Sequence, residues 1–127
     1  MRSGNPRTLR VGEQIRRELS RLLQYEVKDP RVCGVTINDV EVSGDFAHAR
    51  VFYTLFGDQA PGAREASQQG LERAAGFLRA RLGREIRIRQ IPNLHFIYDH
   101  TMEEAERLDT LIEAARRRDS DTGEPDS

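Results

Sequence analysis

The sequence predicts a single α+β domain in which helices cover one face of a three-stranded sheet. Its 127 residues are the usual size of one domain. The apolar residues recur first at helical spacing, then in alternation, and then at helical spacing again. The resulting order is helix, strand, strand, helix, strand, helix. The simplest packing of these elements is a sheet with helices on one side.

The first helix is expected over residues 8–27, after a flexible tail at residues 1–6. Its apolar residues are three or four positions apart: Val11, Ile15, Leu19, Leu22, Leu23 and Val27. Asp29 and Pro30 end the helix, because the residue before a proline avoids the helical region.

Two strands are expected next, over 35–42 and 48–55. Val35 and Ile37 share one phase of the alternation, whereas Val40 and Val42 share the other. The change of phase falls at 38–39 and predicts a bulge or a bend. The turn residues at 43–45 join the strands, which favours an antiparallel hairpin.

The second helix is expected over 63–82, ended by Gly83. Gly76 lies inside it and costs about 1 kcal/mol relative to alanine. One explanation is a kink that splits the helix and brings Phe77 into the core. The alternative is that a small residue is needed for close packing at Gly76.

The last strand is expected to begin at Ile86 and to continue past Pro92 to Tyr98, on an edge or with a bend because of the proline. Thr101 and Glu104 have the spacing of a capping box and open a C-terminal helix over 101–118. We expect residues 119–127 to form a disordered acidic tail.

The charges are distributed unevenly although the whole chain has a net charge of −1 and a pI near 6.3. Residues 1–98 carry 16 basic and 11 acidic side chains, whereas residues 99–127 carry 4 and 10. A basic body with an acidic end is typical of proteins with polyanionic partners. An acidic tail that only keeps the protein in solution would give the same pattern. Every basic residue except Lys28 is arginine, which suits phosphate binding but also follows from genome base composition.

Two groups of arginines are candidates for an RNA-binding surface. Arg10, Arg17 and Arg21 fall on one side of the first helix, and Lys28 continues their line. The stretch 64–89 holds seven arginines and three glutamates, and alternation places Arg87 and Arg89 opposite the core. For both groups the alternative is an ordinary solvated face.

Other classes of function find little support in the sequence. Cys33 is the only cysteine, and His95 and His100 lack the spacing of a helical metal motif, so no metal or cofactor is expected. No nucleophile motif or phosphate-binding glycine loop occurs. No stretch reaches membrane-spanning length and no signal peptide is present, so we expect a cytoplasmic, monomeric, non-catalytic binding protein.

The element order resembles that of a type II KH domain, an RNA-binding fold that normally clamps nucleotides with a GXXG loop. The chain has no GXXG; Ala74-Ala75-Gly76 stands in its place and resembles the kinked helix of the ribosome-binding factor A family. The exit of the first helix, Lys28 to Arg31, and the run from Arg89 through Pro92 to Asp99 resemble the same family. The resemblance covers roughly residues 7–115.

This resemblance implies a KH-like RNA-binding domain over 7–100 that binds 16S rRNA and the small (30S) ribosomal subunit during late maturation. It implies support for correct formation of the 16S rRNA 5′ end, an association with growth in the cold, and no catalysis. The RNA-binding residues that it implies are Arg79, Arg84, Arg87, Arg89, Lys28 and Arg31. The rival interpretation is a protein-interaction adaptor that uses its C-terminal helix and never touches RNA, and a metal-dependent hydrolase is a distant third.

Overall fold

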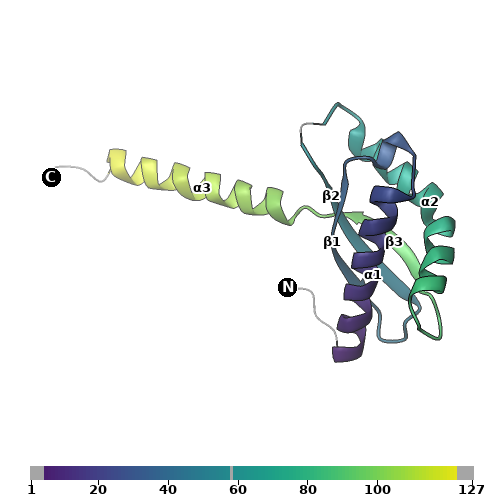
Figure 1. Cartoon of the computed structure of the whole chain (residues 1–127). Helices are drawn as coiled ribbons and strands as arrows, with labels where there is room; N and C mark the ends of the chain where they lie inside the picture. The colour runs from purple at the N-terminus through teal and green to yellow at the C-terminus, as the bar shows by residue number, and fades with distance from the viewer. Residues whose placement is uncertain (1–4, 58, 123–127) are drawn as a thin grey trace.

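The computed structural model describes residues 5–57 and 59–122 and confirms the α+β class. Figure 1 shows the helices and the sheet in chain order. The elements are α1 (Pro6–Tyr25), the short 3-10 helix η1 (Pro30–Val32), β1 (Val35–Val42), β2 (His48–Leu55), α2 (Ala63–Glu85), β3 (Asn93–Tyr98) and α3 (Thr101–Thr122).

The three strands form one sheet in the order β1-β2-β3. β1 and β2 are antiparallel, as the hairpin prediction required, and their register shifts between Ile37 and Asp39 at the predicted bulge. β3 pairs with β2 in parallel, so α2 is the crossover that carries the chain from one strand to the other. β3 is an edge strand, and Pro92 stands just before its first residue, a position that a proline tolerates.

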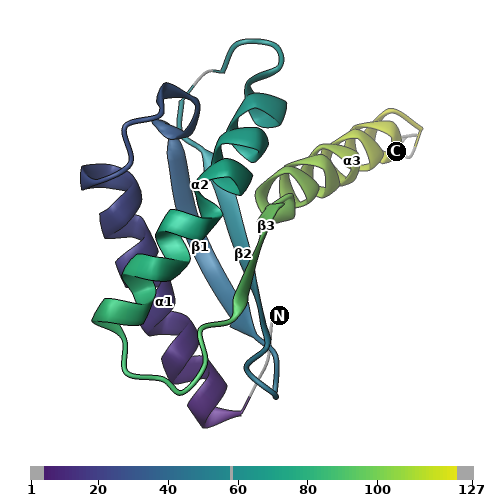
Figure 2. The ribbon, with the colours of Figure 1, turned by 90° about the vertical axis from the view of Figure 1, so that its right-hand side faces the viewer.

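α1 and α2 lie side by side on one face of this sheet, and the core fills the space between them and the strands (Figure 2). Leu19 of α1, Leu78 of α2 and Val51 of β2 are completely buried there. The other face of the sheet carries no helix among the described residues.

Two glycines that sequence reasoning did not single out allow this close packing. A Cβ on Gly12 of α1 would lie 2.6 Å from the backbone oxygen of Val40, and a Cβ on Gly70 of α2 would lie 2.9 Å from Cγ1 of Val32. Each glycine therefore sets the distance between a helix and its neighbour, α1 to β1 and α2 to η1.

α1 begins and ends two residues earlier than predicted. Pro6 is its first residue, where a missing N–H costs nothing, and the Asn5 side chain accepts a hydrogen bond from the Thr8 amide at 2.9 Å. Asn5 and Pro6 therefore belong to the helix start, which corrects the predicted tail at these positions. Residues 1–4 of that tail lie outside the described residues.

The third strand was predicted too early. Residues 86–92 form no ladder, because β2 pairs with β3 only from His48 and its partner Asn93 onward. The alternation itself holds, since Ile86 is buried while Arg87 and Arg89 are exposed. This segment is an irregular connection that keeps the pattern of a strand.

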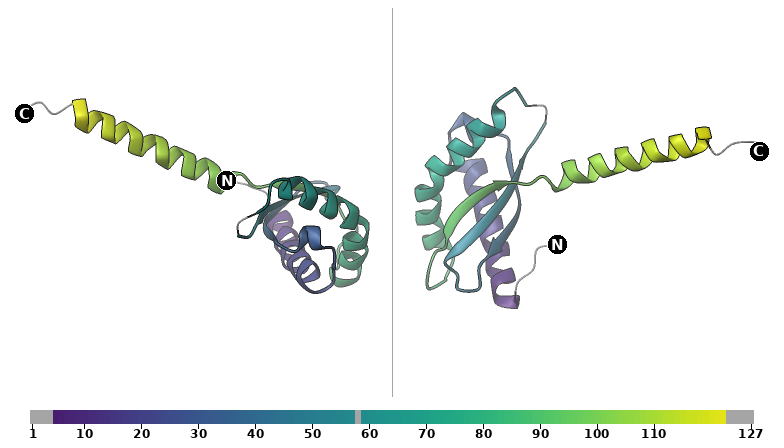
Figure 3. Two further views of the ribbon diagram at one scale, coloured as in Figure 1. Left: turned by 90° about the horizontal axis from the view of Figure 1, so that it is seen from above. Right: turned by 180° about the vertical axis from the view of Figure 1, so that it is seen from behind.

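α2 is continuous over Ala63–Glu85, so the predicted split into two helices and the predicted end at Gly83 are both wrong. Figure 3 shows that the axis of α2 curves along the sheet. A bend centred on Ala74–Gly76, within one continuous helix, therefore stays a prediction. Phe77 does not enter the core, because 44% of it is exposed. A Cβ on Gly76 would meet nothing within 4 Å, so close packing does not explain this glycine either.

α3 projects away from the rest of the molecule (Figures 1 and 3). Its start differs from the predicted capping box, because the Asp99 carboxylate accepts hydrogen bonds from the Thr101 amide at 3.0 Å and hydroxyl at 2.6 Å. The helix continues to Thr122, which corrects the predicted end at 118 and the predicted disorder at 119–122. The remainder of the predicted tail lies outside the described residues.

Candidate nucleic-acid interface

A groove of about 800 Å³ opens at the end of the molecule where α1 begins. Three segments form it: the first turns of α1, the β1–β2 turn, and the connection from α2 to β3, which Figures 1 and 2 show meeting at this end. We call it the arginine groove. Its lining includes four arginines, Arg7, Arg10, Arg87 and Arg89.

These four guanidinium groups are exposed and make no ion pair with any carboxylate in the part of the chain that the structure describes. The one acidic residue of the lining, Asp45, accepts hydrogen bonds from the Ser43 hydroxyl at 2.7 Å and the Ala47 amide at 3.0 Å. The Ser43 hydroxyl and then the Ala47 amide lower the pKa of Asp45. The Asp45 carboxylate is therefore hydrogen-bonded within the turn rather than paired with an arginine of the groove. The groove therefore presents an excess of positive charge.

The predicted arginine stripe on α1 is not uniform. Arg10 lines the groove, but Arg17 pairs with Glu13 at 3.1 Å and Arg21 pairs with Glu18. Glu13 also pairs with Arg16 at 2.5 Å, and chiefly that contact holds the pKa of Glu13 at about 2. Towards the end of α1 the stripe is therefore largely neutralised by its own glutamates.

Lys28 and Arg31, predicted at the exit of α1, differ from each other. Lys28 is exposed and makes no ion pair with any described residue. Arg31 pairs with Asp29 at 2.6 Å and holds the pKa of Asp29 at about 2. Lys28 is thus available to a partner, whereas Arg31 stabilises the turn that contains Pro30.

Arg79, which the sequence suggested as an RNA contact, binds backbone carbonyls of the protein itself. Its guanidinium donates hydrogen bonds to the backbone oxygens of Ile91 at 2.8 Å and Pro92 at 3.1 Å. These carbonyls belong to the connection that lacks a strand partner, so Arg79 holds the α2–β3 segment in place. Arg79 therefore supports the segment that carries Arg87 and Arg89.

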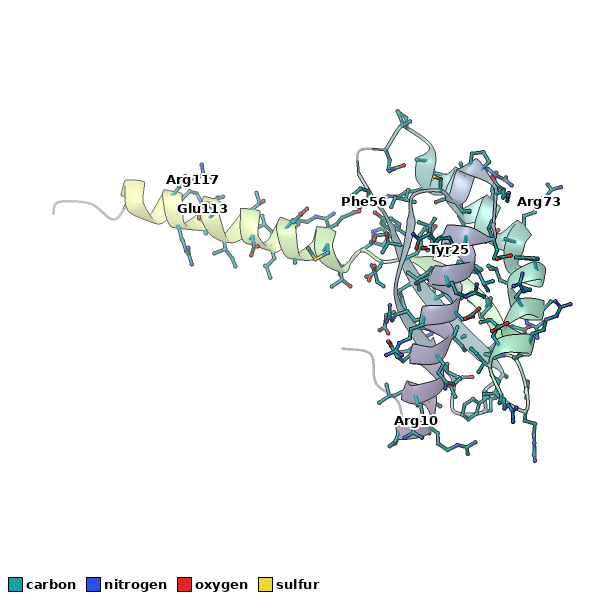
Figure 4. The ribbon with its side chains drawn as sticks, viewed as in Figure 1. Arg10, Tyr25, Phe56, Arg73, Glu113 and Arg117 are labelled. Carbon is teal, nitrogen blue, oxygen red and sulfur yellow. The ribbon has the colours of Figure 1, made fainter. Side chains whose placement is uncertain are left out.

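The remaining arginines of 64–89 point in several directions. Arg64 pairs with Glu103 of α3 and lies 4.0 Å from the centre of the Tyr98 ring, and Arg81 pairs at 3.1 Å with Glu26, the residue that follows α1. Figure 4 shows Arg73 pointing outward from α2, well away from Arg10 at the foot of α1. Arg84 is exposed and makes no ion pair with a described residue, but it is not part of the groove lining. The seven arginines do not form one surface.

Two residues of the groove were missed by sequence reasoning. Arg7 lies with its guanidinium carbon 5.3 Å from the centre of the Phe46 ring. Phe46 has a φ of 61°, in the left-handed region. Among the described residues, it alone adopts a positive φ without being glycine. An aromatic residue beside the Ser43-Gly44-Asp45 turn was the available sequence signal, although nothing local shows that α1 would place an arginine over it.

The residues considered as metal ligands have other contacts. Nδ1 of His48 lies 3.0 Å from Nε2 of His95, and Nδ1 of His100 lies 3.6 Å from Glu103. Among the residues that the structure describes, no three His, Cys, Asp or Glu side chains are grouped so as to hold a metal ion. The described helices include none that is long and apolar enough to cross a membrane.

Comparison with known proteins supplies an independent line of evidence. The family model described as ribosome-binding factor A matches residues 7–112 of the chain. A relative of that name from Thioalkalivibrio sulfidiphilus is 52% identical over 113 residues, which cover 89% of this chain and 86% of the relative.

Solved structures agree with the sequence relatives. The crystal structure of ribosome-binding factor A from Thermus thermophilus matches with a TM-score of 0.63 and 28% identity, covering 72% of this chain and 93% of that one. A homology model of the Thermus thermophilus protein, fitted into the cryo-electron-microscopy map of its complex with 30S, matches with a TM-score of 0.59 and 29% identity over 73% of this chain and 96% of that one.

Proposed function

Because the chain belongs to the ribosome-binding factor A family, we propose that it is a ribosome assembly factor that binds the small ribosomal subunit through 16S rRNA. The observation that carries this proposal is the convergence of Arg10, Arg87 and Arg89 on one groove, free of carboxylate partners among the described residues. The Thermus thermophilus relative fitted into a 30S complex supports the choice of partner.

The chemistry of the groove fits the RNA backbone. Guanidinium groups bind phosphate oxygens through paired N–H donors, and each phosphate that they neutralise releases counterions. Contacts of this kind position a protein on folded RNA without reading its sequence. Lys28, beyond the opposite end of α1, and Arg84, in the last turn of α2, are also exposed and make no ion pair with a described residue, so they are further candidates for phosphate contact outside the groove.

The protein acts by binding rather than by catalysis. A binding protein shifts an RNA conformational equilibrium only by its difference in affinity for the two arrangements. In this proposal it binds the arrangement of late maturation more tightly, acts in the cytoplasm as a monomer, and favours correct formation of the 16S rRNA 5′ end. Its contribution matters most in the cold, where misfolded RNA rearranges slowly.

Sedimentation with purified small and large ribosomal subunits at two salt concentrations tests the binding proposal. The wild-type protein is expected to sediment with small subunits, and less so at high salt. The triple variant Arg10→Glu, Arg87→Glu, Arg89→Glu should lose association while keeping its fold. Association of that variant at the wild-type level would refute the assignment of the groove.

A second candidate function is that of a protein-interaction adaptor, and the exposed apolar face of α3 favours it. Met102, Leu108 and Leu111 of this helix are each more than half exposed. The variant Arg116→Glu, Arg117→Glu, Arg118→Glu separates the two candidates. It changes the net charge by the same amount as the groove variant, but on α3. Loss of association in this variant, with the groove variant unaffected, would favour the adaptor.

The effect on RNA processing needs a separate measurement. A bacterial strain lacking its own family member would be complemented with the wild-type chain or with the groove variant, and 16S rRNA 5′ ends would be mapped by primer extension after growth in the cold. The wild type should restore the mature end and the groove variant should not. Equal restoration by both would contradict a role of the groove in processing.

A further inference from the structure

We propose that the arginine groove is a subsite for one unpaired nucleotide of RNA, whose base stacks on the Arg7–Phe46 pair. This inference rests on the proposed function and deepens it. It assigns a ligand-binding role to the contact between Arg7 and Phe46, which phosphate binding alone does not require.

The position of Phe46 is the first observation. Its φ of 61° lies in the left-handed region, which bulky residues rarely adopt and where glycine or asparagine is usual. A sequence that needed only a left-handed turn residue would place glycine there, as it does at Gly57 with a φ of 79° and at Gly62 with a φ of 83°. The half-buried Phe46 side chain packs against the core and also lines the groove. Backbone strain of this kind gathers at ligand-binding sites.

The partner of the ring is the second observation. Arg7 lies over Phe46 at 5.3 Å, so a planar cation and an aromatic ring meet at the wall of the groove. RNA-binding proteins stack unpaired bases on aromatic side chains and on guanidinium planes, and both surfaces are present here.

The third observation is the arrangement of charge around this pair. Arg10 follows Arg7 along α1, while Arg87 and Arg89 reach the groove from the α2–β3 connection. A base at the Arg7–Phe46 pair would therefore have cations on more than one side for its flanking phosphates. The groove volume of about 800 Å³ lies within the ~300–1,000 Å³ typical of small-ligand sites.

An aromatic ring surrounded by arginines favours an unpaired nucleotide over two other anionic ligands, an RNA duplex and an acidic peptide. A duplex offers its phosphates to arginine but keeps its bases stacked inside, so it would not use Phe46. An acidic peptide would likewise contact the arginines but would not stack on the ring, which would then serve only as packing against the core. Only a ligand with both an exposed aromatic face and neighbouring phosphates uses every feature of the groove.

The experiment measures binding of the full-length chain to a short single-stranded RNA that carries 2-aminopurine, and to the same RNA annealed to its complement. Phe46→Leu keeps an apolar side chain but removes the aromatic face, and Phe46→Tyr keeps the ring. Phe46→Gly removes the ring and relieves the left-handed backbone. Circular dichroism and thermal melting establish that each variant is folded.

We expect Phe46→Leu and Phe46→Gly to weaken binding of the single strand by about 5- to 150-fold, the loss that corresponds to one base stack of ~1–3 kcal/mol. Phe46→Tyr should bind nearly as the wild type does. Duplex binding should change little in any of the three variants. Quenching of 2-aminopurine on binding should disappear with the ring.

Three results would overturn the inference. One is wild-type affinity of Phe46→Leu for the single strand. Another is an equal loss of single-strand and duplex binding, which would make Phe46 a purely structural residue. The third is competition by polyglutamate that is as effective as unlabelled RNA and insensitive to Phe46. If the wild-type chain associates with small subunits while any of these results holds, the nucleotide subsite is refuted and the proposed function stands. If the wild-type chain associates with neither small subunits nor RNA, the proposed function itself fails.

Discussion

Two glycines on the helices of this protein look alike in the sequence and differ in the structure. Gly12 is buried against Val40, whose backbone oxygen would lie 2.6 Å from an added Cβ, whereas an added Cβ on Gly76 would meet nothing within 4 Å. Gly12 is therefore required by packing. Gly76 only lowers helix stability, unless the curvature of α2 depends on it.

The pair Gly12→Ala and Gly76→Ala tests this difference. Gly12→Ala should lower the free energy of unfolding by roughly 1–3 kcal/mol, because a backbone oxygen cannot move aside as a side chain can. Gly76→Ala should raise it by up to about 1 kcal/mol, the helix propensity difference. Urea unfolding followed by circular dichroism measures both. A destabilised Gly76→Ala variant would show that the course of α2 needs this glycine and would support the predicted kink.

Arg79 and Arg89 likewise separate structure from binding. Arg79 donates to the carbonyls of Ile91 and Pro92, and the pair of charge-assisted bonds fixes the connection to β3. Arg79→Ala should lower the free energy of unfolding by about 1.5–3 kcal/mol, while Arg89→Ala should change it by less than ~0.5 kcal/mol.

The two variants should also differ in RNA binding. Arg89→Ala should weaken binding with no loss of thermal stability, since its guanidinium contacts no described carboxylate. Equal melting temperatures for Arg79→Ala and the wild type would mean that the carbonyl contacts of Arg79 contribute nothing to the fold.

At the scale of elements, the sequence was most informative where structure is local. The hairpin and its bulge followed from the change of alternation between Ile37 and Asp39, because side-chain phase is a property of one strand. The start of β3 could not be found in this way. Residues 86–89 alternate as a strand does, but β2 has no residue left to pair with them, and that depends on a register set far away in the chain.

α3 is the element whose sequence pattern has no counterpart in the packing. Leu108 repeats at helical spacing with its apolar neighbours and is nevertheless 58% exposed, whereas Leu78 of α2 is completely buried. Periodicity predicts that a helix has an apolar face but does not say what covers that face.

The matched substitutions Leu108→Ala and Leu78→Ala test the position of α3. Leu108→Ala should change the free energy of unfolding by less than ~0.5 kcal/mol, and Leu78→Ala should lower it by about 2–5 kcal/mol. Denaturant unfolding of the full-length chain gives both values. A Leu108→Ala loss close to that of Leu78→Ala would show that α3 packs on the body in solution.

At the scale of the whole molecule, the candidate site exists only after folding. Arg10 and the pair Arg87 and Arg89 were proposed from separate patterns, a helical stripe and a strand alternation, and the fold brings them to one groove. Sequence reasoning found these three residues because arginines opposite an apolar stripe or alternation are visible locally, even though residues 86–92 form no strand. It missed Arg7 and Phe46, since their contact joins the start of α1 to a distant turn.

The sequence also could not show which arginines are neutralised. Arg17, Arg21 and Arg31 all have acidic neighbours close in the sequence, but the structure shows that those carboxylates pair with them. The surface available to RNA is therefore smaller than the count of arginines suggests, and this difference has a measurable consequence.

The dependence of RNA binding on salt counts the cations that contact phosphate. Each contact contributes about 0.7 for a single strand and about 0.9 for a duplex to the slope of log affinity against log salt. Replacing Arg10, Arg87 and Arg89 by alanine should reduce the slope by about 2–3 if all three contact phosphate. Replacing Arg16, Arg17 and Arg21 by alanine, which removes the same charge from paired positions, should reduce it by less than about 1. Fluorescence titrations between about 50 mM and 200 mM salt, a range over which counterion release changes affinity strongly, give both slopes. Equal reductions in the two variants would mean that net charge alone governs binding and that the groove has no special part in it.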